Sequence, residues 1–120
     1  MSSAPGPKDH PGHRVAVKPA ARRVQVKLDG ELIADSSNAF EMEESGRPAV
    51  YYVPRADARM DRLAKTAHTT YCPFKGHASY FSVKGGPENS VWSYETPYDE
   101  LPEIREYLAF YADKFQIVAL

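Results

Sequence analysis

Cysteine is nearly absent from the sequence, since Cys72 is the only one among 120 residues. A single cysteine excludes an intramolecular disulfide. The sequence also contains no C-x-x-C pair and no H-E-x-x-H motif, two spacings that are typical of zinc sites. No N-terminal apolar run of the signal-peptide type is present, and we therefore expect a cytoplasmic protein.

Long hydrophobic runs and an excess of one charge are missing as well. No stretch approaches the roughly 20 apolar residues that span a bilayer. Fifteen Lys and Arg residues face sixteen Asp and Glu residues, which gives a net charge of −1. Nucleic acids and anionic membranes bind concentrated basic surfaces, so we expect neither as a partner. The sequence leaves the identity of any cofactor and the oligomeric state unknown.

Residues 1–21 lack the hydrophobic pattern of a folded segment and hold four of the ten prolines. Such a composition predicts an extended, partly ordered N-terminal tail, followed by a single β-rich domain over residues 22–120. His10 and His13 lie three positions apart in this tail. Because no further metal-type ligand accompanies them, we interpret both as solvated side chains.

Residue alternation predicts β-strands in most of the remaining chain. Val24, Val26 and Leu28 share one face of a strand, and Asp29-Gly30 then favours a type I′ hairpin turn into a strand at 31–35. Further strands are expected at 39–43, 49–53, 69–71, 78–83, 90–94 and 115–119. The fold class is therefore mainly β.

Two segments have apolar residues at helical spacing. Residues 55–65 predict one or two helical turns. The stripe that begins at Leu101 and continues through Ile104 and Leu108 predicts a second short helix, which ends near Tyr111.

The stretch from His68 to Tyr94 concentrates residue types suited to catalysis and binding, because the only Cys, the only Trp and two of the four His lie here. Cys72 is a candidate catalytic nucleophile if His68, Lys75 or His77 lowers the pKa of its thiol. The alternative is a small buried hydrophobic residue beside a turn. His68, Cys72 and His77 could also be read as three metal ligands, but their spacing is unspecific and we predict no metal site.

A pocket for an anionic or phosphorylated small molecule is the third hypothesis for this region. Cationic side chains and the backbone N–H groups of glycine turns bind anions, hydroxyl groups add donors, and aromatic rings form pocket walls. The glycines could instead be simple turns, and the aromatic residues simple core. The candidate ligand-binding residues are Tyr52, Arg55, Thr70, Lys75, Gly76, Tyr80, Trp92 and Tyr94.

Motifs for nucleotide chemistry are lacking. The sequence contains neither GxxxxGK[ST] nor GxGxxG. Metal-dependent nucleotidyl transfer needs two carboxylates that point the same way to hold Mg²⁺. Only Glu41-Met42-Glu43 has that form, and we interpret it as a solvated strand face.

Several motifs together resemble one known family. They are Arg22-Arg23-Val24 with the Asp29-Gly30 turn, Val50-Tyr51-Tyr52-Val53-Pro54-Arg55, Thr69-Thr70-x-Cys72-Pro73-Phe74-Lys75-Gly76-x-Ala78-x-Tyr80, and Trp92-Ser93-Tyr94. Over about residues 22–118 the chain resembles the domain of unknown function 427 family, which is sometimes labelled nucleotidyltransferase-like. The resemblance implies a small antiparallel β-tent, or Mss4-like, domain with one or two short helices. It also implies that the candidate residues form a shared site with Cys72.

These observations predict a small β domain that binds a small anionic or phosphorylated molecule in an aromatic-lined pocket. Lys75 and Arg55 would hold the anionic group, and Trp92 with Tyr94 would pack an apolar or planar portion. Two alternatives stay open. One is an enzyme, either nucleotidyltransferase-like or dependent on Cys72, and the other is a protein-interaction module that uses exposed Tyr and Trp side chains.

Overall fold

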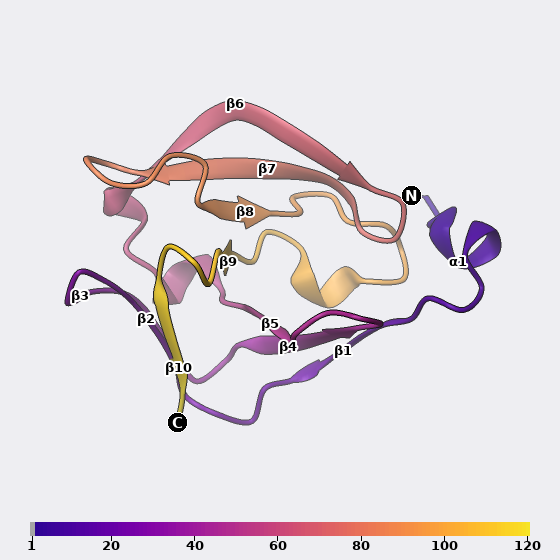
Figure 1. Cartoon of the computed structure of the whole chain (residues 1–120), viewed down its shortest axis with the longest axis horizontal. Helices are drawn as coiled ribbons and strands as arrows, with labels where there is room; N and C mark the ends of the chain where they lie inside the picture. The colour runs from indigo at the N-terminus through magenta and orange to yellow at the C-terminus, as the bar shows by residue number, and fades with distance from the viewer. Residues whose placement is uncertain (1) are drawn as a thin grey trace.

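Antiparallel β-sheets dominate the computed structural model, which describes residues 2–120 (Figure 1). The mainly β class predicted from the sequence is confirmed. The sheets have the orders β1-β4-β5, β10-β2-β3 and β6-β7-β8-β9. The strands are β1 (Val15–Pro19), β2 (Val24–Leu28), β3 (Glu31–Ser36), β4 (Phe40–Glu44), β5 (Val50–Tyr52), β6 (Leu63–Cys72), β7 (Gly76–Val83), β8 (Val91–Ser93), β9 (Ala109–Phe110) and β10 (Gln116–Ala119).

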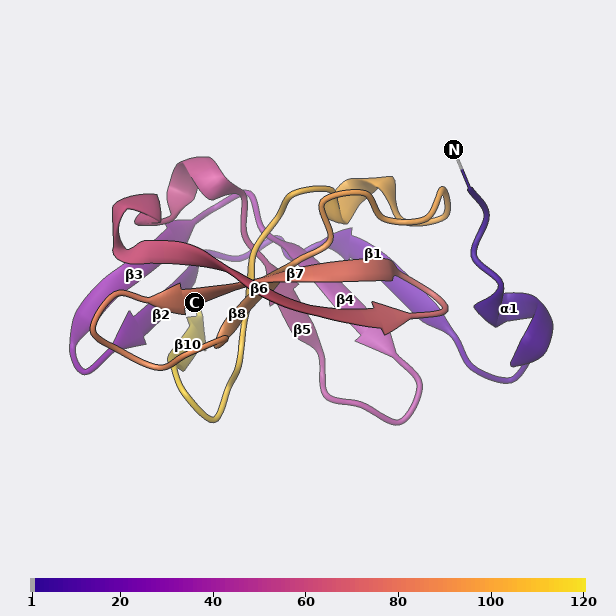
Figure 2. The ribbon, with the colours of Figure 1, turned by 90° about the horizontal axis from the view of Figure 1, so that it is seen from above.

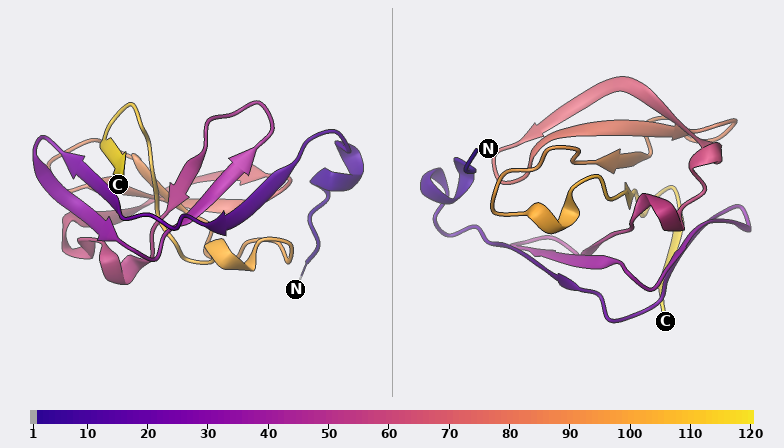
Figure 3. Two further views of the ribbon diagram at one scale, coloured as in Figure 1. Left: turned by 90° about the horizontal axis from the view of Figure 1, so that it is seen from below. Right: turned by 180° about the vertical axis from the view of Figure 1, so that it is seen from behind.

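The strands of the four-stranded sheet follow one another downward from β6 to β9, and the two three-stranded sheets lie side by side beneath it (Figures 1 and 3). Apolar side chains fill the space between the sheets in two clusters. Tyr80 and Trp92 pair across β7 and β8 and contribute to one cluster, whereas the next pair, Phe81 and Val91, belongs mainly to the other region of the core. Successive residues of a strand point to opposite faces, so this sheet packs on both sides.

The hairpin of β2 and β3 follows the sequence prediction. Asp29 and Gly30 have φ angles of 49° and 85°, the positive values that a type I′ turn requires at both central positions. Val24 and Val26 are 0% and 1% exposed and point into the core. Local turn chemistry and strand alternation agree here, which explains why the hairpin could be predicted.

The helical segments are short. They are α1 (Gly6–Asp9) and the 3₁₀ turns η1 (Arg55–Asp57), η2 (Met60–Arg62) and η3 (Pro102–Ile104). The helical turns expected within residues 55–65 are confirmed. None of the helices in residues 2–120 has the length and apolar character needed to cross a bilayer.

The helix expected from Leu101 to Tyr111 is wrong. Only η3 forms, and the chain then extends into β9. Leu101, Ile104 and Leu108 are 5%, 0% and 0% exposed, so their spacing reflects burial of an irregular segment. Leu108 also exchanges two backbone hydrogen bonds of 2.8 Å with Val53, and this bridge holds the segment extended.

The N-terminal residues contain two ordered elements, although the sequence predicts a tail over residues 1–21. Strand β1 pairs with β4 from Val15 opposite Glu44 to Pro19 opposite Phe40. The segment around α1 lies against the turn between β6 and β7, where the Gly6 N–H donates to the Pro73 carbonyl at 2.9 Å (Figure 1). Pairing with a strand distant in sequence is what orders residues 15–19.

Strand β6 is one of the two edge strands of the four-stranded sheet and bends away from β7 at its middle (Figures 1 and 2). The register passes from Lys65 opposite Phe81 to Thr69 opposite Ser79, so β6 advances four residues while β7 advances two. The Thr66 hydroxyl donates a 2.7 Å hydrogen bond to the Asn89 side-chain oxygen. This bond ties the arch to the loop before β8.

Candidate ligand-binding site

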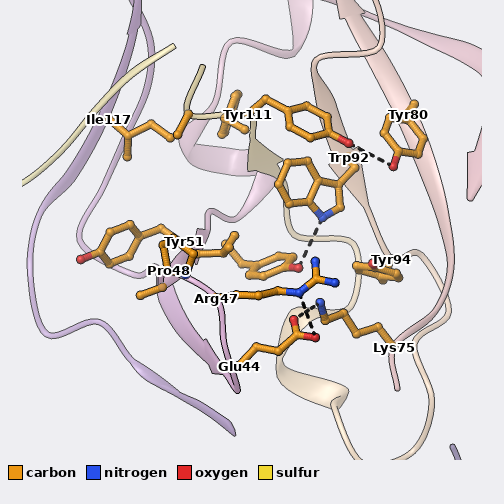
Figure 4. Close-up of a pocket in the computed structure, with 15 residues that line it drawn as sticks. Glu44, Arg47, Pro48, Tyr51, Lys75, Tyr80, Trp92, Tyr94, Tyr111 and Ile117 are labelled. Carbon is orange, nitrogen blue, oxygen red and sulfur yellow. Dashed lines mark hydrogen bonds and ion pairs between the residues drawn. The ribbon is translucent and has the colours of Figure 1, made fainter. Parts of the chain in front are cut away.

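A cavity of about 650 Å³ lies between the β4–β5 hairpin and the four-stranded sheet (Figure 4). Three charged residues, Glu44, Arg47 and Lys75, contribute to its lining. Aromatic rings make up much of the rest and come from β5, β7, β8, β9 and the segments after β8 and β9. They belong to Tyr51, Tyr52, Tyr80, Trp92, Tyr94, Phe110 and Tyr111.

Glu44 is the centre of the charged end of the cavity. Its Oε1 accepts a 2.6 Å hydrogen bond from Lys75 Nζ, and its Oε2 lies 2.8 Å from His13 Nε2 and 3.7 Å from Arg47 Nε. The Glu44 and Lys75 side chains are only 9% and 11% exposed. Burial acts to raise the pKa of Glu44, but the hydrogen bonds from Lys75 and His13 outweigh burial and leave the pKa lowered. Glu44 is therefore a carboxylate at neutral pH.

Lys75 reaches this carboxylate because of the turn that joins β6 and β7. The Lys75 N–H donates to the Cys72 carbonyl at 3.2 Å, which closes the turn. Gly76 follows with φ of 108°, and a Cβ there would lie 3.4 Å from the Thr96 carbonyl oxygen. Glycine suits this position, because the backbone has a positive φ and a backbone atom lies near the place where a Cβ would be. Gly76 thus shapes the turn that carries Lys75, and it does not line the cavity itself.

The aromatic wall is joined by hydrogen bonds between polar ring atoms. Trp92 Nε1 donates to the Tyr52 hydroxyl at 3.4 Å, and the two rings are nearly perpendicular at 88°. The Tyr80 hydroxyl lies 3.0 Å from Thr70 Oγ1 and 3.4 Å from the Tyr111 hydroxyl. The Tyr111 ring is 4.6 Å from the Trp92 ring and inclined at 49°. These contacts fix the positions of the rings before any ligand binds.

Tyr94 offers an available hydroxyl group. Its side chain is buried, with 6% exposure, and its hydroxyl makes no hydrogen bond to any other residue within 2–120. Every fully enclosed side-chain oxygen or nitrogen in that range has a partner, so the Tyr94 hydroxyl must reach open space. Tyr94 is also one of the residues that line the cavity. Buried polar groups are normally satisfied, which marks this hydroxyl as a contact for a ligand or water.

Burial also keeps the phenol groups neutral. It raises the pKa values of Tyr52 and Tyr94 above the ordinary value of 10. Burial and the hydrogen bond to Tyr80 raise the pKa of Tyr111 to about 12. At neutral pH these side chains are hydrogen-bond donors and carry no charge.

Five of the sequence-predicted residues line the cavity together: Tyr52, Lys75, Tyr80, Trp92 and Tyr94. Thr70 reaches it through its hydrogen bond to Tyr80. Arg55 lies elsewhere. It donates to the Glu106 carbonyl at 2.7 Å and to Ser93 and Glu95 at 3.1 Å, and its guanidinium lies 5.3 Å from the Phe81 ring centroid.

Glu95 explains why Arg55 is not available to an anion at the cavity. Its carboxylate accepts hydrogen bonds from Lys65 and Ser79 at 2.8 Å and from Arg55 at 3.1 Å. The bond from Lys65 is the largest cause that lowers the Glu95 pKa to about 2, against the opposing effect of burial. The structure therefore places Arg55 and Lys75 in separate ion-pair clusters.

Cys72 is a half-buried free thiol packed against the cluster that includes Tyr52 and Tyr94. The three residues considered as activators have other partners. The His68 ring lies 4.6 Å from the Tyr80 ring, the His77 ring 4.8 Å from the Tyr71 ring, and Lys75 is bonded to Glu44. Within residues 2–120 no His, Cys, Asp and Glu side chains gather in a group of three that could hold a metal ion.

The polar residues of the site that the sequence did not predict include His13, Glu44, Arg47 and Tyr111. Glu44 and Arg47 lie on a hairpin about thirty positions before Lys75, and no local pattern joins them to it. Tyr111 was placed at the end of a helix that does not form. The high tyrosine content, eight residues, was the one general signal of an aromatic pocket.

A family model described as "Domain of unknown function (DUF427)" matches residues 16–119. The chain belongs to this family. The resemblance seen in the sequence is thereby confirmed, and the DUF427 match includes every cavity-lining residue, whereas His13 lies just before it. A comparison with curated proteins gave no match. The β-tent, or Mss4-like, relationship that the resemblance implies stays a prediction.

Proposed function

We propose that this DUF427 domain binds a small molecule that carries a phosphate or carboxylate group and an apolar or planar remainder. The observation that supports it most directly is the division of the cavity into two parts. The charged residues gather at one end, where Arg47 and Lys75 face the carboxylate of Glu44, and aromatic rings make up much of the rest (Figure 4). Pockets of this composition are the usual form of a ligand site.

Arg47 and Lys75 would play different parts in holding the anion. Lys75 is already paired with Glu44, so it contributes N–H donors more than uncompensated charge. Arg47 lies 3.7 Å from Glu44, which is too far for a hydrogen bond, and its side chain is 68% exposed. Its guanidinium can therefore turn toward a ligand and bind a phosphate or carboxylate with two parallel hydrogen bonds.

The remaining contacts come from the neutral groups of the wall. The Tyr94 hydroxyl can donate to the ligand without losing a partner of its own. Trp92 and Tyr52 are held by their mutual hydrogen bond and need little reordering on binding. A preformed site loses less conformational entropy when it binds, which favours affinity for a small ligand.

A thermal-shift screen of inorganic phosphate, nucleotides, sugar phosphates and carboxylates tests the proposal. A ligand present at about 100 times its Kd should stabilise the domain by about 2.7 kcal/mol, a shift of several degrees in Tm. Arg47→Gln should abolish that shift. Arg59→Gln is the matched control, because Arg59 is 53% exposed, pairs with Asp61 and does not line the cavity.

Two outcomes would contradict the proposal. One is a broad panel without any stabilising compound. The other is a stabiliser whose effect Arg47→Gln and Arg59→Gln reduce equally, because a general charge effect would then explain the shift.

The alternatives named from the sequence remain predictions, with separate tests. A Cys72-dependent enzyme requires the thiol to react with iodoacetamide faster than a free thiol at neutral pH. Nucleotidyltransferase-like chemistry would show nucleotides as stabilisers in the same panel. A protein-interaction module would show capture of a partner that depends on Trp92. The cytoplasmic location also stays a prediction.

A further inference from the structure

We propose that the ligand is a zwitterion whose alkylated ammonium group lies against the rings of Tyr80, Trp92 and Tyr111. Its phosphate or carboxylate would lie at the opposite end, beside Arg47 and Lys75. The inference rests on the proposed anion binding and adds the chemistry of the second end of the ligand.

The first observation is the separation of the two ends of the cavity. Figure 4 shows the side chains of Glu44, Arg47 and Lys75 together at one end, and Trp92, Tyr80 and Tyr111 together at the other. The faces of indole and phenol rings carry partial negative charge, and they attract cations. The aromatic end is therefore complementary to a positive group, and the Arg47 end to a negative one.

The second observation is the inclination of the rings. A flat heterocycle held between two rings needs them nearly parallel. Here the Trp92 ring meets the Tyr52 ring at 88° and the Tyr111 ring at 49°. The Trp92 and Tyr111 centroids are only 4.6 Å apart, so the two rings contact each other and form one angled wall. A rounded group such as an alkylated ammonium can lie against both ring faces of an angled wall, whereas a flat heterocycle can stack on only one.

The third observation concerns hydrogen bonding. Glu44 is the single carboxylate among the described residues that line the cavity, and both its oxygens already have partners. A primary ammonium brings three N–H donors and would lack strong acceptors at the aromatic end. An alkylated ammonium has few or no N–H groups, so it loses nothing there, and burial without partners costs it less.

Two pairs of probes test the inference, and each pair differs only in a nitrogen replaced by carbon. They are phosphocholine against neohexyl phosphate, and glycine betaine against tert-butylacetate. Each pair keeps its shape and its anion, so the ratio of affinities isolates the positive charge. Trp92 is the only tryptophan, and its fluorescence reports binding in the cavity directly. We expect the zwitterion of at least one pair to bind about tenfold more tightly than its carbon analogue.

Variants of Tyr111 provide a second test of the zwitterion proposal. Its side chain is 38% exposed, so substitution leaves the core intact. Tyr111→Leu removes a ring from the wall and should reduce the affinity ratio several-fold. Tyr111→Phe keeps the ring without the hydroxyl and should preserve the ratio.

The outcomes separate this inference from the proposed function. If each zwitterion binds with the same affinity as its carbon analogue, the proposal of a zwitterionic ligand is overturned, and the proposal of anion binding still stands. The same holds if neither zwitterion binds while another phosphate or carboxylate of the screen does so through Arg47. If no compound of the screen or of the pairs binds, both proposals fail.

Discussion

Glu44 is the residue on which the charged end of the cavity depends. Lys75, His13 and Arg47 all approach its carboxylate, and the first two are within hydrogen-bond distance. A buried ion pair contributes little net stability as a whole, but removing one partner leaves the other charge buried and uncompensated. Single and double substitutions should therefore have opposite consequences.

Glu44→Gln should lower the free energy of unfolding by about 3 kcal/mol, because Lys75 then loses its counter-charge. The double variant Glu44→Gln, Lys75→Met should recover most of that loss. Urea denaturation of the wild type, the single variants Glu44→Gln and Lys75→Met, and the double variant measures the coupling between the two side chains. Additive losses in the double variant would show that the two side chains do not interact as described.

The lowered pKa of Glu95 predicts that the stability of the domain depends on pH. Its pKa falls from the ordinary 4.5 to about 2 in the folded protein. A lowered folded-state pKa contributes stability that is complete above about pH 4.5 and is lost as the pH falls toward about 2. Denaturation midpoints across that interval should decline less steeply in Glu95→Gln than in the wild type. Identical slopes would contradict the role of Lys65, Ser79 and Arg55 in holding the carboxylate charged.

Residue type alone identified part of the site. Lys75 and Trp92 lie in a sequence segment rich in rare residues, and both line the cavity. Arg47 and Glu44 could not be joined to them, because contact across a hairpin distant in sequence leaves no local pattern. Arg55 was expected beside Lys75 on the basis of its charge, but an adjacent carboxylate, Glu95, decides where that charge is used.

At the scale of elements, the turn between β6 and β7 positions Lys75. Gly76 is its critical residue, with φ of 108° and the Thr96 carbonyl oxygen 3.4 Å from where a Cβ would be. Any side chain there is strained by its backbone conformation.

Gly76→Ala should therefore destabilise the domain by about 1 to 2 kcal/mol and weaken ligand binding by displacing Lys75. Gly12→Ala is the control, because no atom lies within 4 Å of its Cβ position. Thermal unfolding and the same ligand titration compare the two variants. An unchanged affinity in Gly76→Ala would show that the turn does not position Lys75.

Elements could be predicted where local chemistry determines them. The Asp29-Gly30 turn and its flanking alternation specify a hairpin without help from the rest of the chain. The stripe from Leu101 to Leu108 looks helical only because tertiary burial selected apolar residues at those positions. Strand β1 forms by pairing with β4, and the proline-rich composition around it gave no local sign of a strand.

At the scale of the whole molecule, the N-terminal segment docks on the turn that carries Lys75. A Cβ on Gly6 would lie 2.8 Å from the ring of Phe74, and the His13 ring lies 4.7 Å from the same ring. His13 also contacts Glu44, so the segment adjoins the charged end of the cavity.

Gly6→Val should displace this segment, because the added side chain and the Phe74 ring cannot share the space. Hydrogen exchange should then increase in residues 2–13 while the sheets stay protected. Gly12→Val is the matched control and should leave exchange unchanged, because nothing lies near its Cβ position. Protected amides in Gly6→Val would contradict the docking.

The arch of β6 has a consequence for how neighbouring molecules meet. An edge strand presents unpaired N–H and C=O groups, to which a strand of another chain can add. Between Lys65 and Thr69 the two extra residues bend β6 outward, and the Thr66 bond to Asn89 holds that bend. A bent edge strand can pair with a strand of another molecule only over short stretches. The bend should therefore hinder edge-to-edge joining of sheets into fibrils at β6.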